Sequence, residues 1–161
     1  MSHEAYMQQA IAEARKAFEE DEVPVGAILI DADGGIVAAA HNQVIRLCDI
    51  SAHAEVLALR KAGQAVKNYR LPHTSLYVTI EPCVMCMGAL VHARVQRIVY
   101  GASDPKWGAA GSLYRIGEDN RMNHQPEIIA GVCEETCKQL MLDFFRVRRN
   151  MPSSPGVPDE F

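Results

Sequence analysis

The chain has 161 residues, of which 48% are hydrophobic and 22% are charged. This is enough for one domain with a continuous core and too little for two ordinary domains. The formal net charge of -4 argues against a protein that coats nucleic acid through a basic surface, so any contact with nucleic acid is expected to be local.

The chain contains five cysteines, and an odd count argues against a framework of disulfide bonds. Residues 2–20 form a polar, amphipathic stretch rather than an apolar signal segment. No apolar run approaches the roughly 20 residues that a helix needs to cross a bilayer. The sequence therefore predicts a reduced, cytoplasmic protein that does not enter a membrane.

The first predicted elements are a helix and a hairpin. Apolar residues recur at helical spacing over residues 4–20, which predicts an amphipathic helix that covers one face of a sheet. Residues 25–30 and 36–40 are short apolar runs on either side of a glycine-containing turn. They are predicted to be two antiparallel strands.

A strand between two helices is predicted next. Residues 42–50 look irregular, and a second helix is expected over residues 52–66 with Ser51 as its cap. Residues 76–80 form a third apolar strand. Pro82 suits the first position of a helix, where its missing N–H costs nothing, and the helix is expected to run to about residue 93.

The last third of the chain completes the predicted sheet. Residues 97–101 are a fourth strand, which a right-handed crossover should place parallel to the third. A long loop covers residues 102–126, a short fifth strand residues 127–130 and a last helix residues 133–149. Residues 1–149 are therefore predicted to form one three-layer α/β/α domain with a mixed sheet of about five strands. The proline-rich residues 150–161 are expected to be a disordered tail.

Four residues near the predicted helix starts have the chemistry of a hydrolytic metal site. His53 and Glu55 lie near the start of one helix, and Cys83 and Cys86 near the start of the next. One imidazole and two thiolates can hold zinc and leave a fourth position open for water. Residues two apart in mid-helix point roughly 200° from each other. His53 and Glu55 can therefore share a site only at a helix end, which predicts two helices that point their N-termini at the zinc.

The expected chemistry is hydrolysis by a zinc-bound hydroxide, with Glu55 as a proton shuttle rather than a ligand. The pattern His-x-Glu with Pro-Cys-x-x-Cys is typical of zinc-dependent deaminases. A metalloprotease is excluded, because the sequence lacks His-Glu-x-x-His. Two alternatives remain open: a closed zinc knuckle with a fourth ligand from His41, Cys48 or His92, and four residues that bind no metal.

The chain resembles the cytidine and deoxycytidylate deaminase superfamily, and more closely its bacterial members that act on tRNA adenosine. The similarity extends from about residue 6 to residue 149. Its segments are residues 22–27, 53–55, 68–71, 76–86, 108–112, 123–124 and 143–146.

This resemblance implies the cytidine-deaminase-like fold and assigns roles at the site. His53, Cys83 and Cys86 would bind one zinc ion per subunit, Glu55 would be the proton donor, and Asn42 would contact the target nucleoside. The implied activity is hydrolytic deamination of adenosine to inosine at the wobble position of a tRNA anticodon, by a homodimer.

An enzyme that acts on a base in folded RNA needs that base splayed out of its stack and surfaces that grip its neighbours. An anticodon stem-loop offers such a base. Trp107 departs from the family, which often has a smaller residue there, and it is expected either to stack on an unpaired base or to pack the loop. The candidate substrate-binding residues are Asn42, Asp104, Lys106, Asn123, His124, Phe145, Arg146 and Arg149.

Two other functions stay open. The zinc motif alone does not distinguish tRNA from a free nucleobase or nucleotide such as guanine, cytosine or deoxycytidylate. The basic C-terminal helix favours RNA, because a free-base deaminase has no use for a wide basic rim. A catalytically silent RNA-binding or assembly subunit is the other alternative, and an intact Glu55 argues against it.

Overall fold

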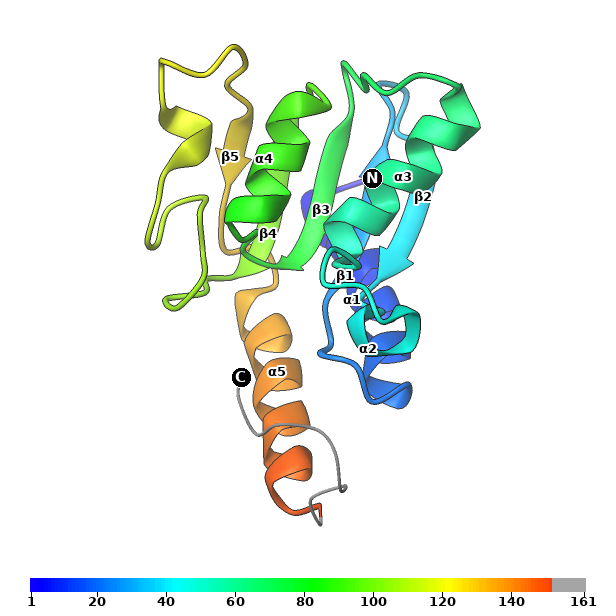
Figure 1. Ribbon diagram of the computed structural model, residues 1–161, viewed down its shortest axis with the longest axis vertical. Coiled ribbons are helices and arrows are strands. Elements are labelled where there is room, and N and C mark those ends of the chain that lie inside the picture. Colours follow the sequence, from blue (N-terminus) through cyan, green and yellow to red (C-terminus); the bar gives the residue numbers. More distant parts are fainter. Residues whose placement is uncertain (152–161) are drawn as a thin grey trace.

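Five strands form one mixed sheet between two layers of helices (Figure 1). The computed structural model describes residues 1–151. The strands are β1 (Gly26–Ile30), β2 (Ile36–His41), β3 (Ser75–Ile80), β4 (Arg97–Ala102) and β5 (Glu127–Ile129). The helices are α1 (His3–Glu19), α2 (Val44–Leu47), α3 (Ala54–Val66), α4 (Val84–His92), the short 3-10 helix η1 (Ile116–Glu118) and α5 (Glu134–Arg149).

The sheet has the order β2-β1-β3-β4-β5. Strand β1 is antiparallel to both of its neighbours, whereas β3, β4 and β5 are parallel to one another. The predicted hairpin, the parallel pairing of the third and fourth strands and the mixed three-layer fold are therefore confirmed. The carboxyl ends of the three parallel strands lie at the same end of the sheet, where α4 begins.

Each face of the sheet is covered by two helices. Helices α3 and α4 pack together on one face, and α1 and α5 pack on the other. Two glycines allow the second pair to approach closely. A Cβ at Gly26 would overlap the backbone of α1 at Ala10 and Ala14, and a Cβ at Gly101 would overlap the sulfur of Cys137 on α5.

The central strands are buried on both faces. All five residues of β1 are buried, as are all residues of β3 and β4 after the first. Such strands have continuous apolar runs rather than alternating ones, as the sequence shows. Strand β2 lies at the edge, and most of its residues are partly or fully exposed.

The connection before α3 differs from the sequence prediction. Residues 42–50 are not wholly irregular, because they contain the one-turn helix α2, which ends at Cys48 in a left-handed conformation (φ 48°). The prediction that Ser51 caps α3 is wrong, since His53 occupies the N-cap position. The Ser51 hydroxyl instead donates a hydrogen bond to the nearby carboxylate of Asp49.

Within residues 1–151, no helix combines the length and apolar character needed to cross a membrane. Of the predicted tail, residues 152–161 lie outside the described part of the chain. The disorder of the tail stays a prediction.

We expect Gly26→Ala to lower the free energy of unfolding by roughly 1–3 kcal/mol, because the new Cβ would overlap the α1 backbone, which cannot rotate away. The matched control is Gly88→Ala in α4, where a Cβ would meet no atom within 4 Å. Alanine is the better helix former by about 1 kcal/mol, so the control should be neutral or stabilising. Urea unfolding of both variants measures the difference, and equal stabilities would contradict the close packing of α1 on β1.

Candidate active site and metal centre

His53 and Cys83 occupy the N-cap positions of α3 and α4, beyond the carboxyl end of β3. Neither side chain makes a capping hydrogen bond to its own helix, so both are free to face a ligand. Glu55 and Cys86 follow in the first turns of the same helices. Both helices begin at the end of the sheet from which α5 extends (Figure 1). This confirms the predicted arrangement of two helix N-termini around one site.

The three proposed ligand atoms have the spacing that zinc requires. The Nδ1 atom of His53 lies 3.6 Å from the sulfur of Cys83 and 3.4 Å from that of Cys86. Tetrahedral zinc, with bonds of about 2.0–2.1 Å to nitrogen and 2.3 Å to sulfur, holds such atoms about 3.5 Å apart. Two thiolates and an imidazole also suit zinc and do not suit magnesium or calcium. The residues therefore fit a zinc ion.

The pKa values of the Cys83 and Cys86 thiols are shifted in opposite directions. The hydrogen bond from Cys86 lowers the pKa of the Cys83 thiol to about 4, and His53 acts in the same direction. The same bond and burial raise the pKa of the Cys86 thiol. The bond to Cys83 in turn raises the pKa of His53. The lowered pKa of Cys83 favours the thiolate form that binds metal, and metal binding would displace the Cys86 proton.

Glu55 is a buried carboxyl beside the proposed ligands. Glu55 is 4% exposed. Burial raises its pKa to about 7, although its own backbone N–H and the charge of His53 oppose the shift. A carboxyl group with a pKa near 7 can both accept and donate a proton at neutral pH, which suits a general acid–base role.

The described residues do not supply a fourth protein ligand. Within residues 1–151, His53, Cys83 and Cys86 are the one group of potential metal ligands that lie within 4.8 Å of one another. The ring of His41 bonds two glutamates instead, and Cys48 is an exposed residue of α2's C-cap. This geometry does not favour the closed zinc knuckle.

Asn42 lies against the first turn of α3, next to His53, and its contact with the nucleoside stays a prediction. It follows β2 directly and is 8% exposed. Its side-chain oxygen accepts a hydrogen bond of 2.8 Å from the N–H of Ala54, the first residue of α3. Asn42 thus takes over the capping that the His53 side chain does not provide, and its amide NH2 group remains available to a ligand.

Glu81 is a buried anchoring residue whose role the sequence analysis did not predict. It is 3% exposed, and its carboxylate accepts hydrogen bonds from the backbone N–H groups of Asp104, Ala110 and Ser112 and from the Ser112 hydroxyl. A Cβ at Gly108 would overlap this carboxylate. Glu81 therefore fixes the loop of residues 103–112 to the strand end that leads into Cys83. A glutamate directly before the Pro-Cys motif was the available signal.

The candidates in that loop lie on its surface. The Asp104 carboxylate accepts bonds from the backbone N–H groups of Lys106 and Trp107 and so closes the turn. Lys106 is exposed, and Trp107 is 70% exposed. This exposure argues against the alternative that Trp107 packs the loop.

The C-terminal helix buries one of its two adjacent phenylalanines and leaves the other partly exposed. Phe144 is 4% exposed and packs edge-on against Phe18 of α1, with 5.5 Å between ring centroids. Phe145 is 40% exposed. Arg146 pairs with Asp143 in an exposed salt bridge. Arg149 is exposed at the last position of the helix.

Asn123 and His124 lie at the other end of the sheet. The Nε2 atom of His124 is 2.6 Å from the carbonyl oxygen of Val95, just before β4 begins. The metal ligands lie beyond the opposite ends of the parallel strands. One copy of the chain therefore does not bring this pair to the site, and their RNA role stays a prediction.

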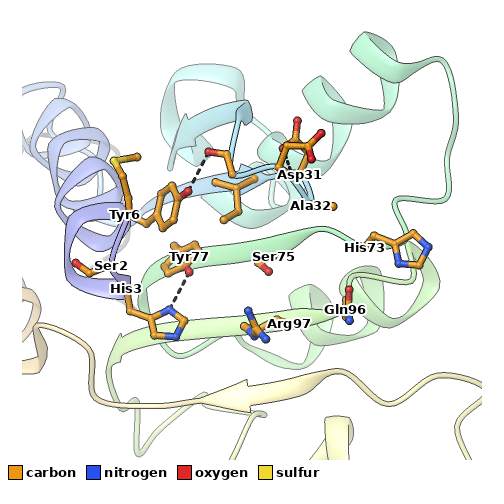
Figure 2. Close-up of a pocket in the computed structure, with 14 residues that line it drawn as sticks. Ser2, His3, Tyr6, Asp31, Ala32, His73, Ser75, Tyr77, Gln96 and Arg97 are labelled. Carbon is orange, nitrogen blue, oxygen red and sulfur yellow. Dashed lines mark hydrogen bonds between the residues drawn. The ribbon is translucent and has the colours of Figure 1, made fainter.

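A hollow of about 620 Å³ also lies away from the metal ligands, between the N-terminus of α1 and the starts of β3 and β4 (Figure 2). Its aromatic hydroxyls are already paired. Tyr6 donates to the carbonyl of Gly34, and the Tyr77 hydroxyl bonds the ring of His3. We assign no function to this hollow.

Comparison with known proteins agrees with the geometry. Residues 1–102 match the cytidine and deoxycytidylate deaminase zinc-binding region. A tRNA-specific adenosine deaminase of Bacillus subtilis is 47% identical over 146 residues, which cover 91% of this chain and 90% of that relative. A solved structure from a study of A-to-I editing by tRNA:A34 deaminases at the wobble position of transfer RNA has a TM-score of 0.82 and 42% identity, covering 84% of this chain and 98% of that chain. A guanine deaminase from Nitrosomonas europaea has a TM-score of 0.75 and 25% identity, covering 88% of this chain and 83% of that chain.

We expect Cys83→Ala and Cys86→Ala each to lose tightly bound zinc, because two remaining protein ligands do not hold it. Metal analysis of the purified protein should fall from about one zinc per chain to nearly none. The matched control is Cys133→Ala, a half-buried cysteine at the start of α5, which should keep its zinc. Full zinc content in the Cys83 and Cys86 variants would remove both from the metal site.

We expect Glu81→Gln to loosen the loop of residues 103–112, because a carboxamide would turn its own N–H groups toward backbone donors. Hydrogen exchange in that loop should accelerate roughly tenfold or more, with zinc retained. Glu118→Gln, at an exposed position of η1, is the control. Unchanged exchange in the Glu81 variant would contradict the anchoring role.

Proposed function

Because the chain belongs to the cytidine and deoxycytidylate deaminase family, we propose that it deaminates adenosine to inosine at the wobble position of a tRNA anticodon. The observation that carries this proposal is a three-ligand zinc site with a buried glutamate beside it, in a chain that aligns over 91% of its length with a tRNA-specific adenosine deaminase. Such a site supports hydrolysis rather than a purely structural role.

The reaction exchanges the amino group of adenine for oxygen, with water consumed and ammonia released. When held by His53, Cys83 and Cys86, zinc supplies the Lewis acidity that makes water a nucleophile at neutral pH. Glu55 takes one proton from that water and delivers it to a purine ring nitrogen, and it then takes the second proton of the same oxygen and gives it to the departing amine. Its pKa of about 7 suits both halves of this transfer. The N-termini of α3 and α4 stabilise negative charge at the same point.

Some of the proposed substrate residues lie on elements that begin or end at the same end of the sheet as this centre. Asn42 lies against the first turn of α3 and can donate to the nucleoside through its amide. Phe145 and Arg149 lie on the helix that extends from this end of the sheet, and Trp107 lies on the loop that Glu81 fixes. Exposed aromatic rings can stack on neighbouring bases, and arginines can bind phosphates. Local contacts of this kind are compatible with a net charge of -4.

We extend the proposal to a homodimer that acts in the cytoplasm. Exposed apolar side chains near the metal end offer surface for a second copy, namely Ile45, Leu47, Ile50, Val84 and Met85. All five cysteines are free, which suits a reducing compartment.

The choice between tRNA and a free base is tested directly with the zinc-loaded protein. We expect inosine to form in a transcribed arginine anticodon stem-loop with adenosine at the wobble position. Guanine, cytosine and deoxycytidylate should release no ammonia under the same conditions. Ammonia from a free base, without inosine in the stem-loop, would show that the chain is a nucleobase or nucleotide deaminase.

We expect Glu55→Ala to lower kcat by roughly 10²–10⁴-fold while zinc content stays unchanged, because the variant lacks the proton shuttle and keeps all three ligands. The control is Glu135→Ala, an exposed glutamate in the first turn of α5. Undiminished deamination by the Glu55 variant would remove this residue from the mechanism.

A further inference from the structure

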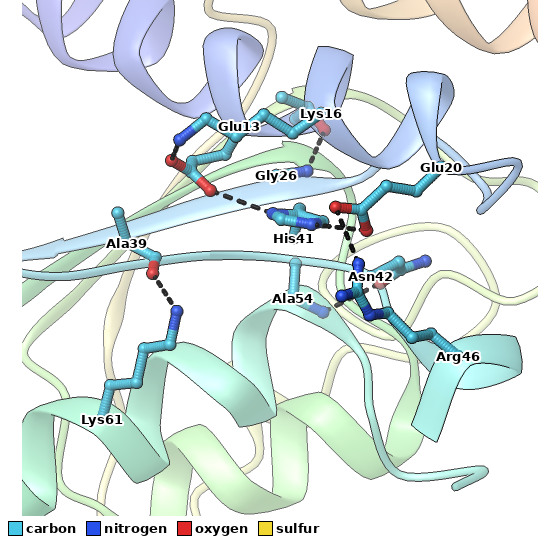
Figure 3. Close-up of polar contacts among 11 residues, drawn as sticks. Glu13, Lys16, Glu20, Gly26, Ala39, His41, Asn42, Arg46, Ala54 and Lys61 are labelled. Carbon is cyan, nitrogen blue, oxygen red and sulfur yellow. Dashed lines mark hydrogen bonds and ion pairs between the residues drawn. The ribbon is translucent and has the colours of Figure 1, made fainter. Parts of the chain in front are cut away.

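His41, the last residue of β2, is held between the carboxylates of Glu13 in α1 and of Glu20, the C-cap residue that follows α1 (Figure 3). Its Nδ1 atom lies 3.1 Å from a carboxylate oxygen of Glu13, and its Nε2 atom lies 3.0 Å from one of Glu20. The ring is 13% exposed. The end of the edge strand β2 is thereby attached to α1.

This geometry requires a charged ring. An ionised carboxylate can only accept hydrogen bonds, and a neutral imidazole has only one N–H to donate. The hydrogen bond from His41 lowers the pKa of Glu20. Burial acts to raise the pKa of Glu13, but the bonds from Lys16 and His41 outweigh it and the pKa is lowered. Both carboxylates are therefore ionised at neutral pH, and two bonds to them need an imidazolium.

The remaining charges around the ring balance the two glutamates. On α1, Lys16 pairs with Glu13 at 2.5 Å. From α2, the Arg46 guanidinium lies 3.4 Å from Glu20. Strand β1 contributes no charged residue, and Lys61 of α3 donates to the carbonyl of Ala39 rather than to the cluster. Loss of the ring charge would leave a ring nitrogen lone pair facing a carboxylate.

His41 directly precedes Asn42, and three hydrogen bonds hold the chain at Asn42 and Gln43. The backbone N–H of Asn42 donates to the carbonyl of Val25 at 3.0 Å. Its side-chain oxygen accepts from Ala54 at 2.8 Å. The N–H of Gln43 donates to the carbonyl of Ala52 at 3.0 Å. The position of the His41 ring therefore helps to set where Asn42 stands relative to the first turn of α3.

We propose that His41 is a positioning residue for the deamination, whose imidazolium clamps the end of β2 to α1 and so holds the Asn42 amide toward the nucleoside. The link to substrate rests on the proposed function, whereas the clamp between His41 and the two glutamates does not. The clamp needs both ring nitrogens, because each of them bonds a different carboxylate.

The protonation state of the ring tests the clamp without any activity measurement. In zinc-loaded protein labelled with nitrogen-15 histidine, we expect both His41 ring nitrogens to carry a proton at pH 7. Loss of the signals in His41→Gln assigns them to this residue. A neutral ring with a single N–H would overturn the proposal.

Kinetics on the anticodon stem-loop test the positioning role. We expect His41→Gln to raise KM roughly tenfold, as a lost charge-assisted hydrogen bond suggests, with little change in kcat or zinc content. His92→Gln, an exposed histidine at the end of α4, is the matched control and should behave as the wild type.

The double variant Glu13→Gln with Glu20→Gln covers the case in which His41→Gln does not fold. Carboxamides can donate or accept, so a neutral His41 can bond both of them. Because this variant keeps a partner for each ring nitrogen, it should keep a KM close to that of the wild type. An unchanged KM in His41→Gln, or a KM in the double variant raised as much as in His41→Gln, would overturn the positioning role. If the wild-type protein leaves the stem-loop unmodified, the proposed function fails, and the ring protonation alone decides the clamp.

Discussion

The site depends on two helices whose N-cap side chains are directed to a metal and do not cap their own helix. A residue at an N-cap normally turns its side chain back to bond the first free N–H groups of the helix. His53 and Cys83 hold these positions without making such bonds, and their ligand atoms meet within zinc-binding distance. The positive ends of both helices then face the point where thiolates and an activated water are needed. For α3, the missing cap is supplied by Asn42, the residue that follows β2.

Two sets of hydrogen bonds to carboxylates, one on each side of this centre, hold the segments that form it. On one side, the Glu81 carboxylate accepts hydrogen bonds from backbone N–H groups of the loop of residues 103–112. These bonds attach the loop to the strand end before Cys83. On the other side, Glu13 and Glu20 hold His41 and thereby the residue that caps α3. Glu81 is buried and Glu13 is half-buried, whereas Glu20 is exposed, and each carboxylate has several partners. Glu81 holds its position most firmly, because a lost partner would leave charge unsatisfied in a region of low polarity.

The sequence predicts the fold well because its signals are local. Continuous apolar runs identify β1, β3 and β4, and Pro82 marks the start of α4. Spacing alone also locates the three zinc ligands and Glu55. Prediction fails where the partner of a residue is distant in the chain. Ser51 is a plausible cap by local rules, but the acceptor for α3 comes from Asn42, twelve residues before Ala54. The anchoring role of Glu81 and the separation of His124 from the site likewise depend on contacts about thirty residues away.

The account rests on a zinc ion with three protein ligands and room for one water. X-ray absorption at the zinc edge of the purified protein measures this most directly, because it counts the donor atoms by type and distance. We expect two sulfurs at about 2.3 Å, one imidazole nitrogen at about 2.0–2.1 Å and one further light atom from solvent. A third sulfur or a second imidazole around the ion would mean a closed structural site and would contradict the hydrolytic chemistry.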